Sequence, residues 1–415
     1  MSGQSSPPAR NGPAVGISSE LRGIDEDVTA AVRRRLAPML DEWLATAADA
    51  DPRFARDIAH RVARFTLVGG SRMRAHLLWW AARSGGATPG PEQARALLTV
   101  ACAVELLQSC ALVHDDVMDG SALRRGAPAL HSALGRQYPV TRPDPPGAPP
   151  FRQSAAILAG DLALAWADDA FAEAALEHPV RAGVRSAWRQ MRCEMVAGQY
   201  LDLRAQALAR QDAEQALRIA YLKTARYSVE HPLALGALLT DVDPDTLGLL
   251  RSAGRCAGIA FQLRDDLLGA FGDPARTGKP VGDDIRAGKA TYLAALAFAR
   301  TRPHGAAAAR AVLQRHLGDP DLTPSDLHRV QEVLESTGAR SAVQAKIADL
   351  SEECRLHLSR AALDPVAGPR LTALLDRAVG RGAETRAGLP AGARIGEAGA
   401  IPARRPALTV QGARP

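Results

Sequence analysis

The chain has 415 residues, of which 47% are hydrophobic, 23% charged and only 4% aromatic. Abundant alanine and leucine with few β-branched residues favour helices over sheets. The formal net charge is +6, but the arginine-rich segment 381–415 carries most of it, so the rest of the chain gives little reason to expect a nucleic-acid partner. The five cysteines have no CxxC spacing and no histidine at metal-binding spacing, which indicates buried thiols in a reducing compartment. We see no signal peptide and no apolar run long enough for a transmembrane segment, and we expect a cytoplasmic protein.

Helical patterns follow one another along most of the chain, with Gly and Pro at the breaks. No segment alternates with period two over the length of a strand, so we predict an all-α fold. We expect one helical domain over 21–380, flanked by disordered tails at 1–20 and 381–415. A proline-rich loop over 138–150 interrupts it. The predicted helices cover 26–48, 53–67, 72–84, 92–119, 152–176, 180–209, 213–240, 245–270, 289–301, 305–317, 324–337 and 339–379, the last broken near Pro365.

Two acidic clusters about 150 residues apart lie towards the ends of predicted apolar helices. The first is Asp115, Asp116 and Asp119, and the second is Asp265 and Asp266. Carboxylates near the C-terminal end of a helix face the negative end of its dipole and also repel each other, so a cation is expected beside them. Aspartate oxygens that leave most coordination positions open suit Mg²⁺, which keeps waters and binds substrate phosphates. Basic residues follow each cluster, as would suit the remaining phosphate oxygens. The pattern indicates a diphosphate site.

The segment Leu112–Asp119, with the Arg-Arg-Gly that follows at 124–126, resembles the first aspartate-rich motif of trans-isoprenyl diphosphate synthases, the polyprenyl synthetase family. Later family motifs are resembled in the same order by Ala159–Asp161, Gly198–Asp202, Lys223–Ala225, Phe261–Asp266 and Thr277–Asp284. The resemblance implies a single large helical bundle of the isoprenoid synthase type with a central active-site cavity, and it also implies a homodimer. It implies a prenyltransferase that joins isopentenyl diphosphate head to tail to an allylic diphosphate, with several Mg²⁺ ions in the site.

The same resemblance assigns roles to individual residues. It implies that the five aspartates of the two clusters bind Mg²⁺, with Asp116 and Asp266 as outer or auxiliary ligands. The allylic diphosphate would be held by Arg124, Lys223, Lys279 and Lys289, and isopentenyl diphosphate by Arg74, Gln108 and Arg125. Lys223, Thr224 and Gln262 would act in catalysis by facing the carbocation.

Two positions depart from the family pattern. Ser71 stands where the family usually has a lysine that binds isopentenyl diphosphate, and Gly269 stands at the third aspartate of the second cluster. Asp273 is a possible substitute for the missing carboxylate. These departures keep two alternatives open: a terpene cyclase-like enzyme that ionises an allylic diphosphate without isopentenyl diphosphate, or a weakly active partner subunit of a synthase.

Product length in this family depends on the helix that carries the first cluster, because the growing tail runs back along it. One helical turn rises about 5.4 Å, which is comparable with one five-carbon unit. Ala111 and Cys110 are small, so no aromatic ring closes the pocket one turn before Asp115, whereas Leu107 could close it one turn deeper. We therefore predict geranylgeranyl diphosphate, with twenty carbons, as the product, and leave a product of twenty-five carbons or more as the alternative.

Overall fold

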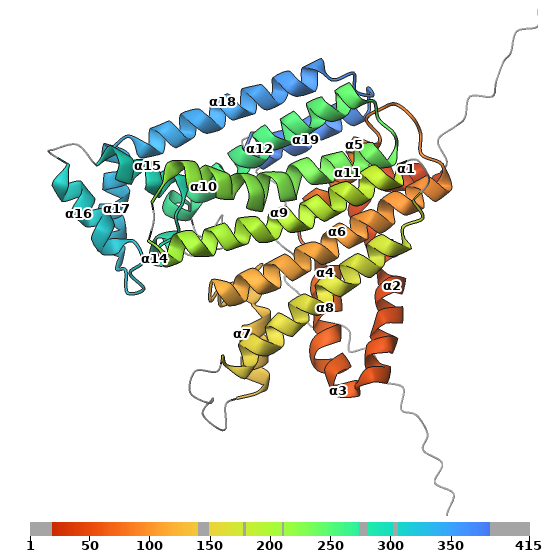
Figure 1. Ribbon diagram of the computed structural model, residues 1–415, viewed down its shortest axis with the longest axis horizontal. Coiled ribbons are helices and arrows are strands. Elements are labelled where there is room, and N and C mark those ends of the chain that lie inside the picture. The colour runs from red at the N-terminus through yellow and green to blue at the C-terminus, as the bar shows by residue number, and fades with distance from the viewer. Residues whose placement is uncertain are drawn as a thin grey trace, which may run out of the picture. The chain divides into compact units, whose positions relative to one another are not determined.

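The computed structural model describes residues 19–139, 149–176, 180–209, 211–273, 281–301 and 306–381 (Figure 1). Nearly all of the two predicted tails, most of the proline-rich loop and Lys279 lie outside these ranges, so the structure does not bear on those predictions.

The described residues confirm the all-α prediction, with one small hairpin added. The N-terminal half contains α1 (Ser19–Glu26), α2 (Val28–Ala50), α3 (Pro52–Phe54), the π-helix η1 (Ala55–Ala59), α4 (His60–Val68), α5 (Met73–Ala82), α6 (Pro91–Met118), β1 (Leu123–Arg124), β2 (Ala127–Pro128), α7 (Leu130–Gln137), α8 (Phe151–Glu173) and α9 (Arg181–Ala207). The C-terminal half contains α10 (Ala213–Ile219), the π-helix η2 (Ala220–Glu230), α11 (His231–Leu239), α12 (Pro244–Phe271), α14 (Asp283–Arg286), α15 (Tyr292–Arg300), α16 (Ala307–His316), α17 (Pro324–Ser336), α18 (Ala339–Arg360) and α19 (Ala367–Ala378).

The long helices begin where the sequence places its breakers. Proline at the first helical position starts both α6 and α12, where its missing N–H is no loss. Asp243 also caps α12, since its side chain accepts a hydrogen bond of 2.8 Å from the backbone N–H of Thr246. Sequence analysis did not predict α7, α14 or the hairpin, because each is too short to show a period.

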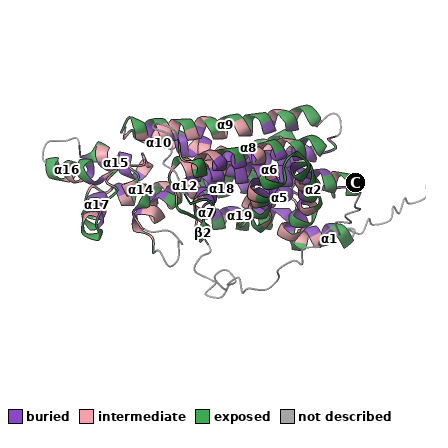
Figure 2. Ribbon diagram, turned by 90° about the horizontal axis from the view of Figure 1, so that it is seen from below, coloured by how far each residue is buried: buried purple, intermediate pink, exposed green. Residues whose placement is uncertain are grey.

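Helix α6 lies in the core, where it packs against α8, α5 and α2. Figure 2 shows buried residues gathered about α6 and α5. The expectation that no segment resembles a membrane helix was wrong for α6, which is long and apolar enough by composition, but 78% of its most apolar window is buried inside the fold. A core helix that is covered on nearly all sides needs apolar residues all round, and this explains its composition.

The hairpin follows directly after the first acidic cluster and turns at two residues. Arg125 and Gly126 both have positive φ, 55° and 75°, and Arg124 pairs with Ala127 across the turn. Two successive residues in the left-handed region are typical of a tight hairpin turn. The turn separates the two adjacent arginines: Arg124 contacts the end of α6, whereas the Arg125 guanidinium lies over the ring of Phe65.

The segment η2 lies between α9 and α12 and approaches both closely. A Cβ atom added at Gly198 of α9 would lie 2.6 Å from the backbone nitrogen of Lys223. A Cβ atom added at Gly258 of α12 would lie 2.4 Å from the Cα atom of Ala225. Glycine at these two positions therefore allows three backbones to meet around Lys223 and Thr224.

Candidate active site

The first acidic cluster lies at the end of α6 and is surrounded by cations. Asp115 accepts hydrogen bonds of 3.1 Å from both Lys223 and Arg124, and Asp116 accepts bonds of 2.8 and 2.5 Å from Arg124. Burial alone would raise the pKa of Asp115, but the charges of Lys223, Lys289 and Arg124 outweigh it and lower the pKa. For Asp116, burial is the larger effect and raises the pKa despite the bond to Arg124.

Lys289 links the first cluster to Asp284 of α14. Its Nζ atom lies 2.9 Å from a carboxylate oxygen of Asp119 and 3.5 Å from one of Asp284. Burial would lower the pKa of Lys289, but these two carboxylates raise it well above the ordinary value, so the side chain stays charged. Lys289 therefore lies within the site.

Within the second cluster, Asp265 is exposed and Asp266 is buried. Asp266 accepts a hydrogen bond of 2.8 Å from Gln262 and is 7% exposed. Burial raises the pKa of Asp266 to about 7, and the charges of Asp284 and Asp265 add to the effect. A divalent cation beside these carboxylates would offset both causes.

Lys223 bridges the end of α6 and α9. Besides Asp115, its Nζ atom contacts Asp202 at 2.8 Å. Burial would lower the pKa of Lys223, yet the two carboxylates raise it. Asp202 belongs to a motif that sequence analysis singled out, but its pairing with Lys223 was missed because 21 residues separate the two in the chain.

Two adjoining cavities meet at this point. A polar cavity of about 210 Å³ is lined by Asp115 of the first cluster and by Asp265 and Asp266 of the second, together with Arg124, Asp202, Asp284 and Lys289. A larger and more apolar cavity of about 430 Å³ is lined by residues of α6, α9, η2 and α12. Asp115, Lys223, Thr224 and Gln262 line both cavities. The arrangement suits a ligand with a polyanionic head and a long apolar tail.

The predicted catalytic residues lie at this junction. The hydroxyl of Thr224 donates a hydrogen bond of 2.5 Å to the Gln262 side-chain oxygen. The Gln262 amide therefore has its oxygen held by Thr224 and its nitrogen held by Asp266. This fixes the orientation of the oxygen that the resemblance places opposite the carbocation.

Two of the three residues predicted to bind isopentenyl diphosphate line the apolar cavity, and Arg125 is not among its lining residues. Arg74 and Gln108 line it, and Arg74 donates a hydrogen bond of 2.6 Å to Ser228 while stacking over the ring of Tyr227. Burial lowers the pKa of Arg125, and the nearby arginines 72, 74 and 124 add to this effect against the opposing charge of Glu105. A group of guanidiniums that disfavour one another's charge attracts an anion.

Neither Ser71 nor Arg72 replaces the missing lysine. Ser71 is exposed. Arg72 lies directly before α5, and its backbone has a positive φ of 47°. Its guanidinium is buried and contacts Glu105 at 3.1 Å and the backbone oxygen of Thr66 at 2.8 Å. Arg72 is therefore a structural residue here.

The residues predicted to set product length lie at two depths. Cys110 and Ala111 line the apolar cavity. Leu107 is fully buried one turn deeper in α6 and is not among the lining residues. Tyr227, which sequence analysis did not assign, forms part of the wall instead, because η2 turns its ring inwards next to Arg74.

The carboxylates present fit Mg²⁺ bound in an open site. Within the described ranges, no three side chains of Asp, Glu, His or Cys lie close enough to form a closed metal cage. Mg²⁺ is commonly held by one or two carboxylates, waters and substrate phosphates, so a cage is not required. One oxygen of Asp119 is buried and has no hydrogen-bond partner among the residues that the structure describes, and a bound cation would satisfy it.

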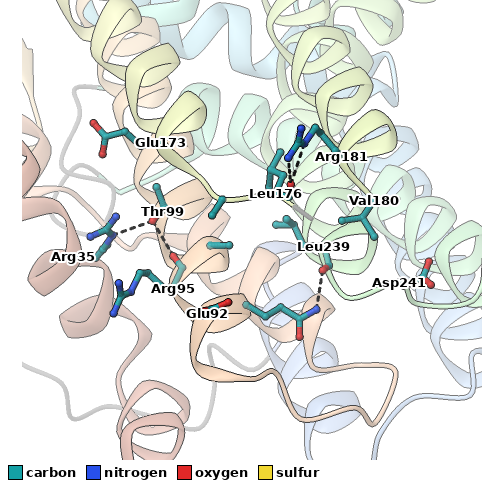
Figure 3. Close-up of a pocket in the computed structure, with 13 residues that line it drawn as sticks. Arg35, Glu92, Arg95, Thr99, Glu173, Leu176, Val180, Arg181, Leu239 and Asp241 are labelled. Carbon is teal, nitrogen blue, oxygen red and sulfur yellow. Dashed lines mark hydrogen bonds between the residues drawn. The ribbon is translucent and has the colours of Figure 1, made fainter. Parts of the chain in front are cut away.

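A further cavity lies elsewhere in the fold. It measures about 630 Å³ and is lined by the N-terminal half of α6 together with parts of α2, α8, α9 and α11 (Figure 3). Arg35 donates a hydrogen bond of 2.9 Å to Thr99 there. Thr99 and Asp115 are both on α6, and at about 1.5 Å rise per residue they are more than 20 Å apart along the helix. This cavity therefore does not belong to the acidic site.

The fold and the two adjoining cavities define a class of helical enzymes that bind prenyl diphosphates. Residues 56–333 match the model of the polyprenyl synthetase family, and the chain belongs to this family. It is an isoprenyl diphosphate synthase, a trans-prenyltransferase that elongates a prenyl chain. The cyclase and partner-subunit alternatives find no support in this comparison.

Individual relatives agree on the chemistry but differ in product. A geranylgeranyl diphosphate synthase of Mycobacterium tuberculosis (strain ATCC 25618 / H37Rv) is 33% identical over 315 residues, which cover 75% of this chain and 80% of that protein. A geranylfarnesyl diphosphate synthase of Aeropyrum pernix is 29% identical over 318 residues, covering 76% and 91%. The crystal structure of a geranylgeranyl pyrophosphate synthase from Corynebacterium glutamicum, complexed with isoprenyl diphosphate and magnesium, is 37% identical with a TM-score of 0.77, covering 85% of this chain and 98% of that one.

Proposed function

We propose that this prenyltransferase condenses isopentenyl diphosphate with an allylic diphosphate, using Mg²⁺ held by both acidic clusters, and that its product is geranylgeranyl diphosphate. The observation that carries the proposal is the junction of the two cavities at Asp115, Lys223, Thr224 and Gln262. A diphosphate in the polar cavity would place the first carbon of its prenyl chain at this junction.

Each group of residues then has a distinct task. Lys223, Lys289 and Arg124 offer fixed positive charge to the allylic diphosphate, and Asp115 and Asp202 keep these cations oriented. Mg²⁺ bound by the aspartates would neutralise the departing diphosphate. The Gln262 oxygen supplies a negative dipole at the junction and stabilises the carbocation in a site that excludes water.

Isopentenyl diphosphate would bind on the arginine side. Arg74 and Arg125 supply guanidiniums for its diphosphate, although Ser71 removes one cation from the family pattern. Each lost contact to a diphosphate weakens binding. We therefore expect a higher KM for isopentenyl diphosphate than in family members that keep this lysine, with the reaction itself retained.

The small side chains beside the apolar cavity support a twenty-carbon product. Cys110 and Ala111 leave room for the tail one turn below Asp115. Among the relatives, both twenty-carbon and twenty-five-carbon synthases occur, so family membership alone leaves the length open.

The deciding experiment incubates purified protein with farnesyl diphosphate, Mg²⁺ and labelled isopentenyl diphosphate. The product is dephosphorylated and its chain length is measured by chromatography. We expect labelled geranylgeraniol. A twenty-five-carbon main product would refute the assigned length, as would a failure to elongate farnesyl diphosphate. A hydrocarbon formed without isopentenyl diphosphate would refute elongation.

The pocket assignment is tested by Ala111→Phe. A phenyl ring at this position fills the cavity next to Asp115, so we expect shorter products. Ala345→Phe places the same ring at an exposed position on α18 and serves as the matched control, with no expected change. An Ala111→Phe enzyme with the same product distribution as the control would contradict the assignment.

We infer that more than one Mg²⁺ ion binds in the site, because the two acidic clusters flank one polar cavity. Treatment with EDTA should abolish turnover, and added Mg²⁺ should restore it. Calorimetric titration in the presence of inorganic diphosphate measures the number of ions, and a stoichiometry of one would refute the inference.

We also propose a homodimer, supported by apolar residues exposed on α8 and α9. Ile157 and Leu158 of α8 and Val196 and Tyr200 of α9 are 42% to 63% exposed. Large exposed apolar groups commonly mark protein interfaces. Light scattering coupled to size exclusion should give twice the chain mass, and Leu158→Asp should shift it towards the monomer. A wild-type monomer would refute the proposal.

A further inference from the structure

The segment η2, which carries Lys223 and Thr224, is π-helical over 11 residues. π-Helices are rare and occur mostly as single-turn bulges, so a longer one depends on its neighbours for support. Part of this support is a cluster of polar side chains contributed by α9, by η2 and by the first residue of α11. The cluster consists of Glu194, Tyr221, Arg226, Glu230 and His231.

One carboxylate oxygen of Glu194 binds two residues that lie five apart in the chain. Its Oε2 atom lies 2.6 Å from Nε of Arg226 and 2.7 Å from Nε2 of His231. Burial would raise the pKa of Glu194, but the hydrogen bonds from Arg226 and His231 outweigh it and lower the pKa. The carboxylate is therefore charged and accepts a hydrogen bond from each partner.

The five-residue spacing of these two partners is that of a π-helix. A π-helix joins residues five apart through its backbone, and the backbone N–H of His231 donates to the Arg226 oxygen in this way. In an α-helix, with 3.6 residues per turn, side chains five apart point about 140° away from each other. The oxygen that Arg226 and His231 share therefore favours the π-helical register of η2 over the α-helical one.

Arg226 also ties successive turns of η2 to one another. Its Nη1 atom donates hydrogen bonds of 3.1 Å to the Tyr221 hydroxyl and 3.2 Å to the Glu230 carboxylate. The side chains of Arg226 and His231 are only 17% and 3% exposed. Water therefore competes little for these bonds, and they hold η2 more firmly than a surface ion pair would.

One face of α9 contacts η2 along its length. Glu194, Gly198 and Asp202 follow one another at steps of four residues and therefore share this face. Asp202 contacts the Lys223 ammonium at 2.8 Å, and Gly198 leaves room for the Lys223 backbone. Glu194 binds the end of η2 at the other end of the row. The position of Lys223 and Thr224 therefore depends on this face of α9.

We propose that Glu194 is a positioning residue, which holds η2 in its π-helical register and so orients Thr224 for the reaction. Thr224 donates a hydrogen bond of 2.5 Å to the Gln262 oxygen, so a rotation of η2 would move the dipole that faces the carbocation. Glu194 is not among the described residues that line the two adjoining cavities, and it acts through η2. The inference rests on the roles of Thr224 and Gln262 in the proposed function.

Three substitutions of Glu194 separate the reach of the side chain from its charge. Glu194→Gln keeps the length and an oxygen that can accept both hydrogen bonds. Glu194→Asp keeps the charge but withdraws the carboxylate by one methylene group, about 1.5 Å. Glu194→Ala removes reach and charge together. Glu332→Ala is the control, because it removes a carboxylate that is 62% exposed on α17.

The assay follows the addition of labelled isopentenyl diphosphate to farnesyl diphosphate. The single-turnover rate, which measures the chemical step, should fall about tenfold or more in Glu194→Ala and Glu194→Asp, because the groups beside the reacting atoms are displaced. KM for farnesyl diphosphate should change less, since the Gln262 dipole acts on the carbocation and not on the bound substrate. Glu194→Gln and Glu332→Ala should keep a rate close to that of wild type.

Hydrogen exchange measured by mass spectrometry follows η2 directly. Peptides that cover 220–230 should exchange faster in Glu194→Ala and Glu194→Asp than in wild type, whereas peptides of α12 should exchange as in wild type. Circular dichroism identifies any variant that fails to fold. If Glu194→Ala does not fold, the comparison of Glu194→Asp with Glu194→Gln carries the test.

The outcomes distinguish this inference from the function on which it rests. Wild-type single-turnover rates in Glu194→Ala and Glu194→Asp overturn the positioning role, even if these variants are less stable. A folded Glu194→Gln variant as slow as Glu194→Ala also overturns it, because charge and not reach would then decide the rate. Wild-type protein that does not elongate farnesyl diphosphate overturns the proposed function, and unchanged exchange of η2 in Glu194→Asp would still overturn the support of η2 by Glu194.

Discussion

Gly198→Ala should displace Lys223 from its place in the site, because α9 and η2 are in close contact at Gly198. The added Cβ atom would lie 2.6 Å from the Lys223 nitrogen, and the two backbones must separate by about 0.8 Å to restore an ordinary contact of 3.4 Å. Such a shift would carry the Lys223 contacts to Asp115 and Asp202, now 3.1 and 2.8 Å, beyond hydrogen-bonding distance.

The expected cost has two parts. Overpacking of a close contact costs about 1–3 kcal/mol, whereas alanine gains about 1 kcal/mol over glycine within a helix. Gly248→Ala in α12 is the matched control, since nothing lies within 4 Å of its added Cβ atom and it carries only the gain. The free energy of unfolding should therefore differ between the two variants by about 1–3 kcal/mol.

Two measurements check this prediction. Urea unfolding at one protein concentration compares the stabilities. The rate of incorporation of labelled isopentenyl diphosphate compares kcat/KM, which should fall about a hundredfold in Gly198→Ala, because misplacement by an ångström near the reacting atoms has effects of that size. If Gly198→Ala matched Gly248→Ala in both, the close approach of α9 and η2 would not position Lys223.

Two further predictions concern buried charge. Arg72→Met should destabilise the fold by about 3–5 kcal/mol, because it leaves the buried carboxylate of Glu105 unpaired. Adding Glu105→Leu should recover most of this loss of unfolding free energy, measured by urea unfolding. An Arg72→Met variant as stable as wild type would contradict the prediction. Burial lowers the pKa of His76, His131 and His231 below 6.5, so these rings stay neutral in the folded chain while the unfolded chain takes up protons. The stability contributed by these rings is therefore fully present above pH 6.5 and is lost as the pH falls below it, by up to about 1.4 kcal/mol per pH unit for each ring. His231→Gln should flatten the profile of unfolding free energy against pH. An unchanged slope would refute the contribution of His231.

The sequence alone determined the elements that follow from local chemistry. Helical periodicity and the Gly and Pro breakers located the long helices within a few residues, as at α6 and α12. Ordered motifs identified the family, and with it the two acidic clusters and Lys223. These features depend on residues close together in the chain, where spacing translates directly into a shared helix face.

Only the tertiary structure decided which charges meet. The pairing of Lys223 with Asp202, the burial of Arg72 against Glu105 and the placement of Asp284 above Gly269 each join segments that no local period connects. Glycines at helix contacts let two backbones approach closely, because glycine has no Cβ atom. The sequence alone does not show which two backbones will be neighbours. The acidic residues of the site could therefore be predicted from the sequence, whereas their ion-pair partners depend on the packing of the helices.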